Sequence, residues 1–171
     1  MRGYSRGGRL KAEYVNPFVA ATGQTLREVL GIAVRRGEPD ALAELATHEQ
    51  VNIAIGITGD VQGMLIVGMS VLTADRIASQ ITQQQIVTFD QVAAQTVAEL
   101  SNRIADHAII GLEDHGYTCD ATPPTVIRGK NVKMDTMGVA TLKLPFDLGE
   151  HGEVTIALSL GERLEGLLSA A

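Results

Sequence analysis

Acidic and amide side chains recur at helical spacing between residues 95 and 106. Intervals of three or four residues separate Gln95, Glu99, Asn102 and Asp106, and such residues are neighbours on a helix. A wheel of about 100° per residue places them within roughly 60° of one another. The carboxylate of Glu99 and the carboxamide of Asn102 would project together into solvent or into a partner. On spacing alone, however, a solvated helix face is the favoured interpretation.

Small and apolar residues accompany this polar face. Ala98 and Ala105 lie beside it on the wheel, and their small side chains leave the polar residues accessible to a partner. Ile109 adds an apolar side chain on the same side, which is typical of a docking surface. The predicted partner-binding residues are Gln95, Ala98, Ala105, Asp106 and Ile109.

A long helix must carry these residues. The segment Thr88-Phe89-Asp90-Gln91 has the Thr-x-x-Gln form of a capping box, and helical character continues to Gly116. Seven apolar residues fall in one stripe about 160° wide, which is predicted to face the core. They are Phe89, Val92, Ala93, Val97, Leu100, Ile104 and Ala108.

Further helices are predicted from capping and breaking residues. Asn16 is a preferred N-cap and Pro17 suits a first helical position, so a helix is predicted from Pro17 to about Leu30 that stops at Gly31. Residues 34–40 are predicted to form a loop. Short helices are predicted over 41–47 and over 74–81, the latter capped by Thr73.

Alternating apolar residues predict the strands of a sheet. Gly59-Asp60 marks a turn between two of them, and the residues around Gly149 to Gly152 join two others as a hairpin. Pro123-Pro124 predicts an extended connection, and Pro145 within a strand predicts a sheet edge or a bulge. The predicted strands cover 51–57, 64–71, 126–127, 142–146 and 154–160.

Length and charge limit the function classes. A chain of 171 residues with 45% apolar and 20% charged residues is typical of one globular domain. A net charge of −6 argues against binding to nucleic acid, which needs a basic face. A Gly-rich basic head is expected to be a disordered leader over 1–13, before a domain over 14–171. Its basic residues are Arg2, Arg6, Arg9 and Lys11.

The single cysteine and the absence of a long apolar run predict the compartment. Cys119 cannot form an intramolecular disulfide, which fits a reducing environment. A catalytic thiol stays open as an alternative, although no base is marked for it. No run of about 18 apolar residues and no signal-peptide core occur, so a cytoplasmic location without membrane contact is expected.

Other polar motifs give weaker candidates for chemistry. Asp106 and His107 could form an acid–base pair, but adjacent helical residues diverge by about 100°, and His107 falls on the core stripe. The histidines show no metal-ligand spacing, so no metal site is predicted. Residues 59–63 lack the Lys-Ser/Thr and the following helix of a phosphate-binding loop, so a hairpin turn explains them better.

Four segments in order resemble one known family. Glu99-Leu100-Ser101-Asn102 looks like the Glu-x-x-Asn signature of the CheC/CheX/FliY phosphatases, in the middle of a long helix. Residues 14–18, 56–63 and 122–127 also resemble CheX. The resemblance spans roughly residues 13–162. CheC-type members usually carry a second Glu-x-x-Asn pair on the first helix, and this chain has none there, so CheX is the nearer match.

The resemblance implies a fold and an activity. The fold is expected to be α+β and CheC-like, a single domain with long helices packed on a β-sheet. The activity is expected to be hydrolysis of the aspartyl phosphate on a CheY-like response regulator. By analogy, Asn102 orients the attacking water and Glu99 forms a salt bridge with the partner's active-site lysine.

The same resemblance implies the cofactor and the assembly. No cofactor of its own is expected, because the Mg²⁺ would belong to the phosphorylated response regulator. CheX relatives join sheet edges, so a homodimer is expected. Two alternatives stay open. One is a non-catalytic module that docks a response regulator or a motor component, and the other is a small-molecule hydrolase, for which no nucleophile or metal set is found.

Overall fold

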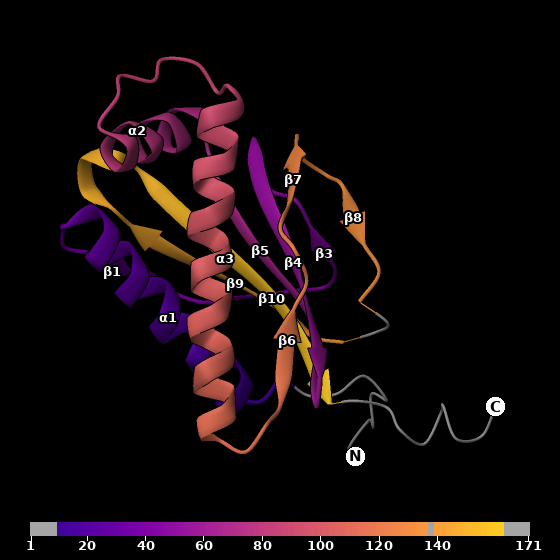
Figure 1. Ribbon diagram of the computed structural model, residues 1–171. Helices are drawn as coiled ribbons and strands as arrows, with labels where there is room; N and C mark the ends of the chain where they lie inside the picture. The colour runs from indigo at the N-terminus through magenta and orange to yellow at the C-terminus, as the bar shows by residue number, and fades with distance from the viewer. Residues whose placement is uncertain (1–9, 137–138, 163–171) are drawn as a thin grey trace.

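Three helices cover one face of a β-sheet in this computed structural model, which describes residues 10–136 and 139–162 (Figure 1). The helices are α1 (Ala12–Leu30), α2 (Val71–Thr82) and α3 (Gln91–Asp114). They pack their buried residues against the sheet in one continuous apolar core. The predicted α+β architecture is therefore confirmed.

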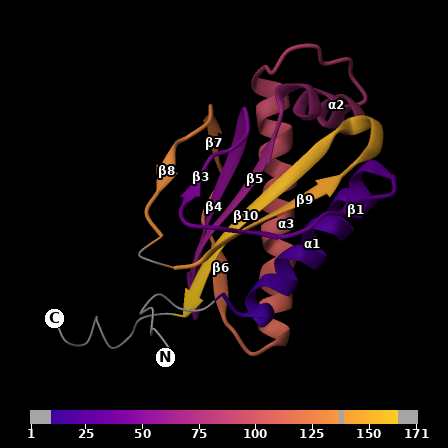
Figure 2. The same cartoon turned by 180° about the vertical axis from the view of Figure 1, so that it is seen from behind.

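The main sheet has eight strands and antiparallel pairings throughout. Its order is β1-β9-β10-β5-β4-β6, with β2 also pairing with β9 and β7 also pairing with β4. The short strands β3 and β8 form a separate pair on the side away from the helices (Figure 2). The strands are β1 (Arg35–Arg36), β2 (Asp40–Leu42), β3 (Leu45–Ala46), β4 (Val51–Gly59), β5 (Val61–Met69), β6 (Cys119–Ala121), β7 (Thr125–Arg128), β8 (Lys133–Met134), β9 (Thr141–Asp147) and β10 (Glu153–Glu162).

Both faces of the central strands are buried. The alternation of apolar residues along these strands had not indicated that the second face is covered. The helix-covered face holds the main core, and a small second cluster lies on the opposite face beneath β3 and β8. That second cluster consists of Leu45, Ala54, Ile66 and Ala157. The predicted strands are confirmed, except that the one predicted over 64–71 ends at Met69 and Val71 already belongs to α2. The turn after Gly59 is confirmed, and so is the hairpin between β9 and β10, which contains a 3₁₀ turn, η1 (Gly149–His151).

The first helix begins earlier than predicted. It starts at Ala12, and the Asn16 cap is wrong because Pro17 lies inside the helix. The extra turn is held by tertiary contacts, since Tyr14 is fully buried. The helix ends at Gly31, which adopts the left-handed conformation with φ 63° as predicted. Of the predicted leader, residues 1–9 lie outside the described residues, whereas Ala12 and Glu13 are already helical.

The caps of the other two helices also differ from the prediction. The Ser70 side chain accepts a hydrogen bond from the Thr73 amide, so α2 begins at Val71 and Thr73 is not its cap. Likewise Asp90, not Thr88, caps α3 by accepting a hydrogen bond from the Ala93 amide at 2.8 Å. In both cases another polar residue nearby supplies the cap oxygen.

The segment between α1 and β4 is extended, so the helix predicted over 41–47 is wrong. Residues 40–42 pair with β9 as β2, and residues 45–46 pair with β8 as β3. Pairing with a distant strand overrides a weak local helical preference here. The sheet edge predicted from Pro145 is wrong, because β9 has β10 on one side and β1 and β2 on the other. Pro145 lies opposite the gap between β1 and β2, where its carbonyl accepts a hydrogen bond from the Gly37 amide at 2.8 Å.

Helices α1 and α3 approach closely where Pro17 meets Gly111. A β-carbon on Gly111 would lie 2.9 Å from the Pro17 Cβ, which is closer than packed carbon atoms can approach. The glycine therefore allows the two helices to meet at this point. The contact lies on the side of α3 opposite to Glu99 and Asn102, as residue spacing on a helix requires.

Candidate functional site

The predicted catalytic pair lies on the outward side of α3. Glu99 is exposed and Asn102 is half-buried, and three residues on a helix put them about one turn apart. Gln95 Nε2 donates to Glu99 Oε1 at 3.5 Å, a long contact that leaves the carboxylate available. Within the part of the chain that the structure describes, the Asn102 side chain forms no hydrogen bond. The acid and the amide are thus both available to a partner.

Two of the predicted docking residues are in the core instead. Ala105 is 0% exposed and Ile109 is 9% exposed, so neither lines an open surface. The buried arc of α3 is wider than the sequence stripe indicated, because the helix also packs against β6 and β4. Gln95 and Asp106 are exposed and Ala98 is half-buried, which keeps these three at the surface.

Two apolar residues that the sequence analysis missed lie on the outward side of α3. Val92, which was assigned to the core stripe, is 45% exposed, and Ile110 is 56% exposed. They are 18 residues apart, which is five full turns, so they share one direction with each other and nearly with Glu99. We call the exposed surface from Val92 to Ile110, with Glu99 and Asn102 between them, the outer face of α3.

Beneath this surface, two buried hydroxyl groups of α3 are hydrogen-bonded within the helix. The Thr96 hydroxyl donates to the Val92 carbonyl at 2.7 Å, and the buried Ser101 hydroxyl donates to the Val97 carbonyl at 2.8 Å. Both are bonds from a side chain to the preceding turn of the same helix. The polar groups on the buried side are therefore satisfied within α3 and do not compete for the residues on its outer face.

The acid–base alternative at Asp106 and His107 does not form. Asp106 is exposed, whereas His107 is half-buried and its Nδ1 lies 3.1 Å from the Thr25 hydroxyl of α1. His107 therefore packs between the two long helices, as predicted. Residues 10–136 and 139–162 contain no group of three or more His, Cys, Asp or Glu side chains that could hold a metal ion.

The cysteine alternative is disfavoured by its surroundings. Cys119 is buried, and its Sγ lies 3.4 Å from the Val61 amide that donates to it. Burial raises the pKa of the thiol, so the reactive thiolate is disfavoured. None of the helices in the described ranges is long and apolar enough to span a membrane.

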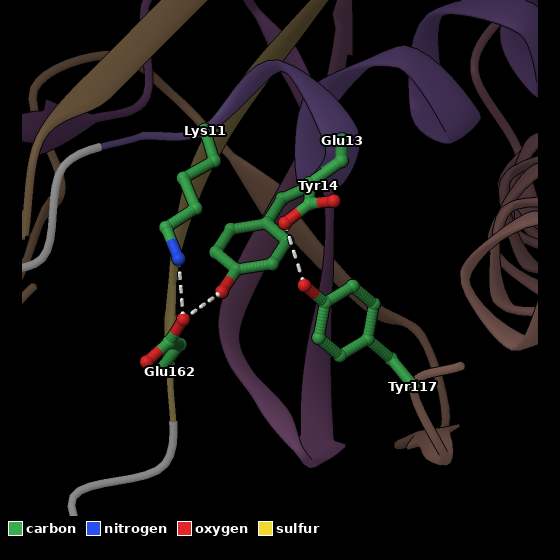
Figure 3. A network of polar contacts seen from close by, with 5 residues as sticks. All are labelled: Lys11, Glu13, Tyr14, Tyr117 and Glu162. Atoms are coloured by element: carbon green, nitrogen blue, oxygen red, sulfur yellow. Dashed lines mark hydrogen bonds and ion pairs between the residues drawn. The ribbon is translucent and has the colours of Figure 1, made fainter. Parts of the chain in front are cut away.

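A second polar cluster lies where the start of α1 meets the end of β10 (Figure 3). Glu162 accepts hydrogen bonds from Lys11 Nζ at 2.5 Å and from the Tyr14 hydroxyl at 2.6 Å. The Tyr117 hydroxyl donates to Glu13 at 2.6 Å, and the rings of Tyr14 and Tyr117 meet edge to face at 5.2 Å. We call these five residues the corner network.

The charges in the corner network reinforce one another. The hydrogen bond from Lys11 lowers the pKa of Glu162, and the same contact raises the pKa of Lys11. Burial, followed by the hydrogen bond to Glu162, raises the pKa of Tyr14 and keeps the phenol protonated. Each polar group points at another member of the network, so its evident role is to hold the chain together.

Comparisons with known proteins identify the family and the fold. The family model described as chemotaxis phosphatase CheX matches residues 51–147. The CheY-P phosphatase CheX of Thermotoga maritima is 32% identical over 152 residues, which cover 88% of this chain and 97% of that protein.

Solved structures share the fold along almost their whole length. A CheC-like superfamily protein from Shewanella sp. PV-4 superposes with a TM-score of 0.79 at 22% identity, over 88% of this chain and 99% of that one. The CheX–CheY–BeF3–Mg²⁺ complex from Borrelia burgdorferi matches with a TM-score of 0.77 at 28% identity, over 89% and 100%. The chain therefore belongs to the chemotaxis phosphatase CheX family.

Proposed function

We propose that this protein hydrolyses the aspartyl phosphate of a CheY-like response regulator. The observation that carries the proposal is the free acid and amide of Glu99 and Asn102, one turn apart on the outer face of α3. The printed names of its relatives, a CheY-P phosphatase and a CheX–CheY complex, support the same substrate.

Asn102 is the residue that positions the attacking water. Phosphoryl transfer passes through a loose transition state, so orientation and charge stabilisation contribute more than a strong base. A carboxamide both donates and accepts hydrogen bonds. The carboxamide of Asn102 forms no hydrogen bond to the described residues, so it is available to a water molecule. Holding a water in line with the phosphorus can supply several kcal/mol of the barrier reduction.

Glu99 is the residue that fixes the position of the bound response regulator. Its carboxylate is exposed and has one long contact, with Gln95. A charge-assisted hydrogen bond to the lysine of the response-regulator site would be short and directional. Because Glu99 and Asn102 share one rigid helix, such a bond also sets where the amide lies relative to the phosphoryl group.

The outer face of α3 supplies the docking surface. The helix has 24 residues, which is about 36 Å of length. Val92 and Ile110 give apolar contact toward its two ends, on either side of the polar pair. Gln95, Ala98 and Asp106 complete the surface, and the buried Ala105 and Ile109 take no part in it.

The cofactor, assembly and location follow from the same proposal. The Mg²⁺ needed for the reaction would be held by the response regulator, and this chain would contribute Glu99 and Asn102 to the active site of that partner without binding the metal. We also propose that the protein acts in the cytoplasm, where a response regulator would be found, and that it forms a homodimer through a sheet edge.

A dephosphorylation assay tests the activity. A CheY-like regulator is phosphorylated with acetyl phosphate, the excess is removed, and phosphate release is followed with Mg²⁺ present and with the protein at one tenth of the regulator concentration. The expected result is multiple-turnover acceleration over spontaneous decay. Binding to the phosphorylated regulator without acceleration would instead identify a non-catalytic docking module and would contradict the proposal.

A further inference from the structure

A pocket of about 1000 Å³ lies on the outward side of α2, away from the residues proposed for phosphatase activity. Its floor is a stripe of α2 side chains at helical spacing, including Leu72, Asp75 and Ser79. One wall is the segment that leads to α3, with Ile86 and Val87, and the other is the η1 turn. The pocket thus spans three elements rather than one loop.

Hydrogen bonds hold both walls of the pocket in place. Ser79 Oγ accepts from the Ile86 amide at 2.9 Å and donates to the Ile86 carbonyl at 3.2 Å. Across the floor, Arg76 donates to the Glu150 carbonyl at 2.6 Å, and His151 contacts the Gln80 side chain. The pocket is therefore formed before any ligand arrives, as most small-molecule sites are.

Asp75 is the unusual residue of this pocket. It is 6% exposed, and its Oδ1 has no hydrogen-bond donor among the described residues. The charge of Arg128 acts on Asp75, but its guanidinium lies over the Phe89 ring at 4.6 Å and forms no salt bridge with Asp75. Burial, reinforced by the charge of Asp90, raises the pKa of Asp75. An unpaired buried carboxyl costs stability, so a binding role would explain its presence.

The charges and walls of the pocket indicate what it would bind. Asp75 and Glu150 supply two carboxylates against one guanidinium, and Arg76 is already engaged by the Glu150 carbonyl. Leu72 and Val87 are exposed apolar residues at the pocket, 58% and 76% accessible. We infer that this pocket binds a small organic cation, with its ammonium or guanidinium group on Asp75 and a short apolar chain against Leu72 and Val87. This inference does not rest on the proposed function.

Titration of the full chain with simple probes tests the inference. Chemical shifts of the backbone amides are followed by NMR while n-butylguanidinium, n-butylammonium, neutral 1-pentanol or pentanoate is added. The two cations are expected to bind with a Kd of about 1 mM and to shift the amides of Ser79, Ile86 and His151. Equal binding of the neutral alcohol, or no saturable shift with either cation, would overturn the inference.

Variants separate a specific site from a general attraction of cations to an acidic protein. Asp75→Asn should weaken n-butylguanidinium binding about tenfold. Glu113→Gln removes an exposed carboxylate outside the pocket and should leave the affinity unchanged. Because Asp75→Asn removes a costly buried charge, the variant should fold at least as stably as the wild type, which a thermal melt would check. Undiminished binding by Asp75→Asn contradicts the site.

Discussion

The corner network and the outer face of α3 use similar residues in opposite ways. In the corner network, each acid, amine and phenol is bonded to another residue of the same chain. On the outer face of α3, the carboxylate has one long contact and the amide has none within the described residues. Polar groups that satisfy each other stabilise a fold, whereas polar groups that are held in place but left free can bind something else. Substitutions in the two regions should therefore affect different measurements.

The largest expected effect is that of Asn102→Ala on catalysis. Loss of the amide should lower kcat about a hundredfold, because the attacking water is no longer held in line. Binding of the phosphorylated regulator should persist, and the free energy of unfolding should change by less than about 0.5 kcal/mol, since the side chain forms no hydrogen bond to the described residues. Single-turnover dephosphorylation and urea unfolding measure the two quantities. Undiminished kcat would remove the proposed mechanism.

The next effect is that of Glu99→Ala on docking. We expect kcat/KM to fall about tenfold, because one charge-assisted contact with the partner is lost. The effect should be smaller at high salt, where the exposed pair is screened. The assay is dephosphorylation at several regulator concentrations and two ionic strengths. Asp114→Ala is a suitable control, since it removes an exposed acid at the end of the same helix. An equal loss in that control would argue for general charge rather than a specific contact.

Tyr14→Phe, in the corner network, should lower stability and leave catalysis unchanged, which is the opposite of the effect expected for Asn102→Ala. The variant removes a hydrogen bond to Glu162 and keeps the buried ring, so it should lower the free energy of unfolding by about 1 kcal/mol. The catalytic rate should not change, because the corner network does not belong to the outer face of α3. Urea unfolding and the dephosphorylation assay run on one sample test both parts. A change of rate without a change of stability would break the contrast between the two regions.

A smaller effect is expected from the apolar ends of the docking surface. Val92→Ser and Ile110→Ser should each raise KM about threefold with kcat unchanged, because each removes apolar contact area from the complex but no reacting group. Val132→Ser is the matched control, since Val132 is 42% exposed but is not on α3. If all three variants behave alike, the docking surface has been assigned wrongly.

The smallest effect concerns pH. The folded-state pKa of Glu162 is lowered, mainly by the hydrogen bond from Lys11. Its contribution to stability is therefore complete above the ordinary pKa of a glutamate and is lost as the pH falls through the lowered value. Glu162→Gln should be less stable than the wild type near pH 7 and nearly equal to it in acid. Urea unfolding at several pH values measures the difference, and a gap that stays constant in acid would contradict this assignment.

Local patterns predicted much of the fold but not the limits of the buried surface. The strands, the stop at Gly31 and the direction of Glu99 and Asn102 follow from spacing and from strong local signals. The start of α1 and the extended segment over 41–47 depend on contacts with β10 and β9, which no local pattern contains. For the same reason Ala105 and Ile109 were assigned to the surface, because contact with β6 widens the buried arc of α3.

The absence of a side chain at Gly111 has a consequence for the orientation of the residues proposed for phosphatase activity. Because Pro17 packs against Gly111, a side chain at this position would have to push α3 away from α1 or turn it about its own axis. Asn102 lies nine residues from Gly111, about 14 Å along the helix axis. A rotation of α3 at Gly111 would therefore displace the Asn102 amide. Packing at Gly111, on the far side of the same helix, would thus help to set the position of the amide proposed to hold the water.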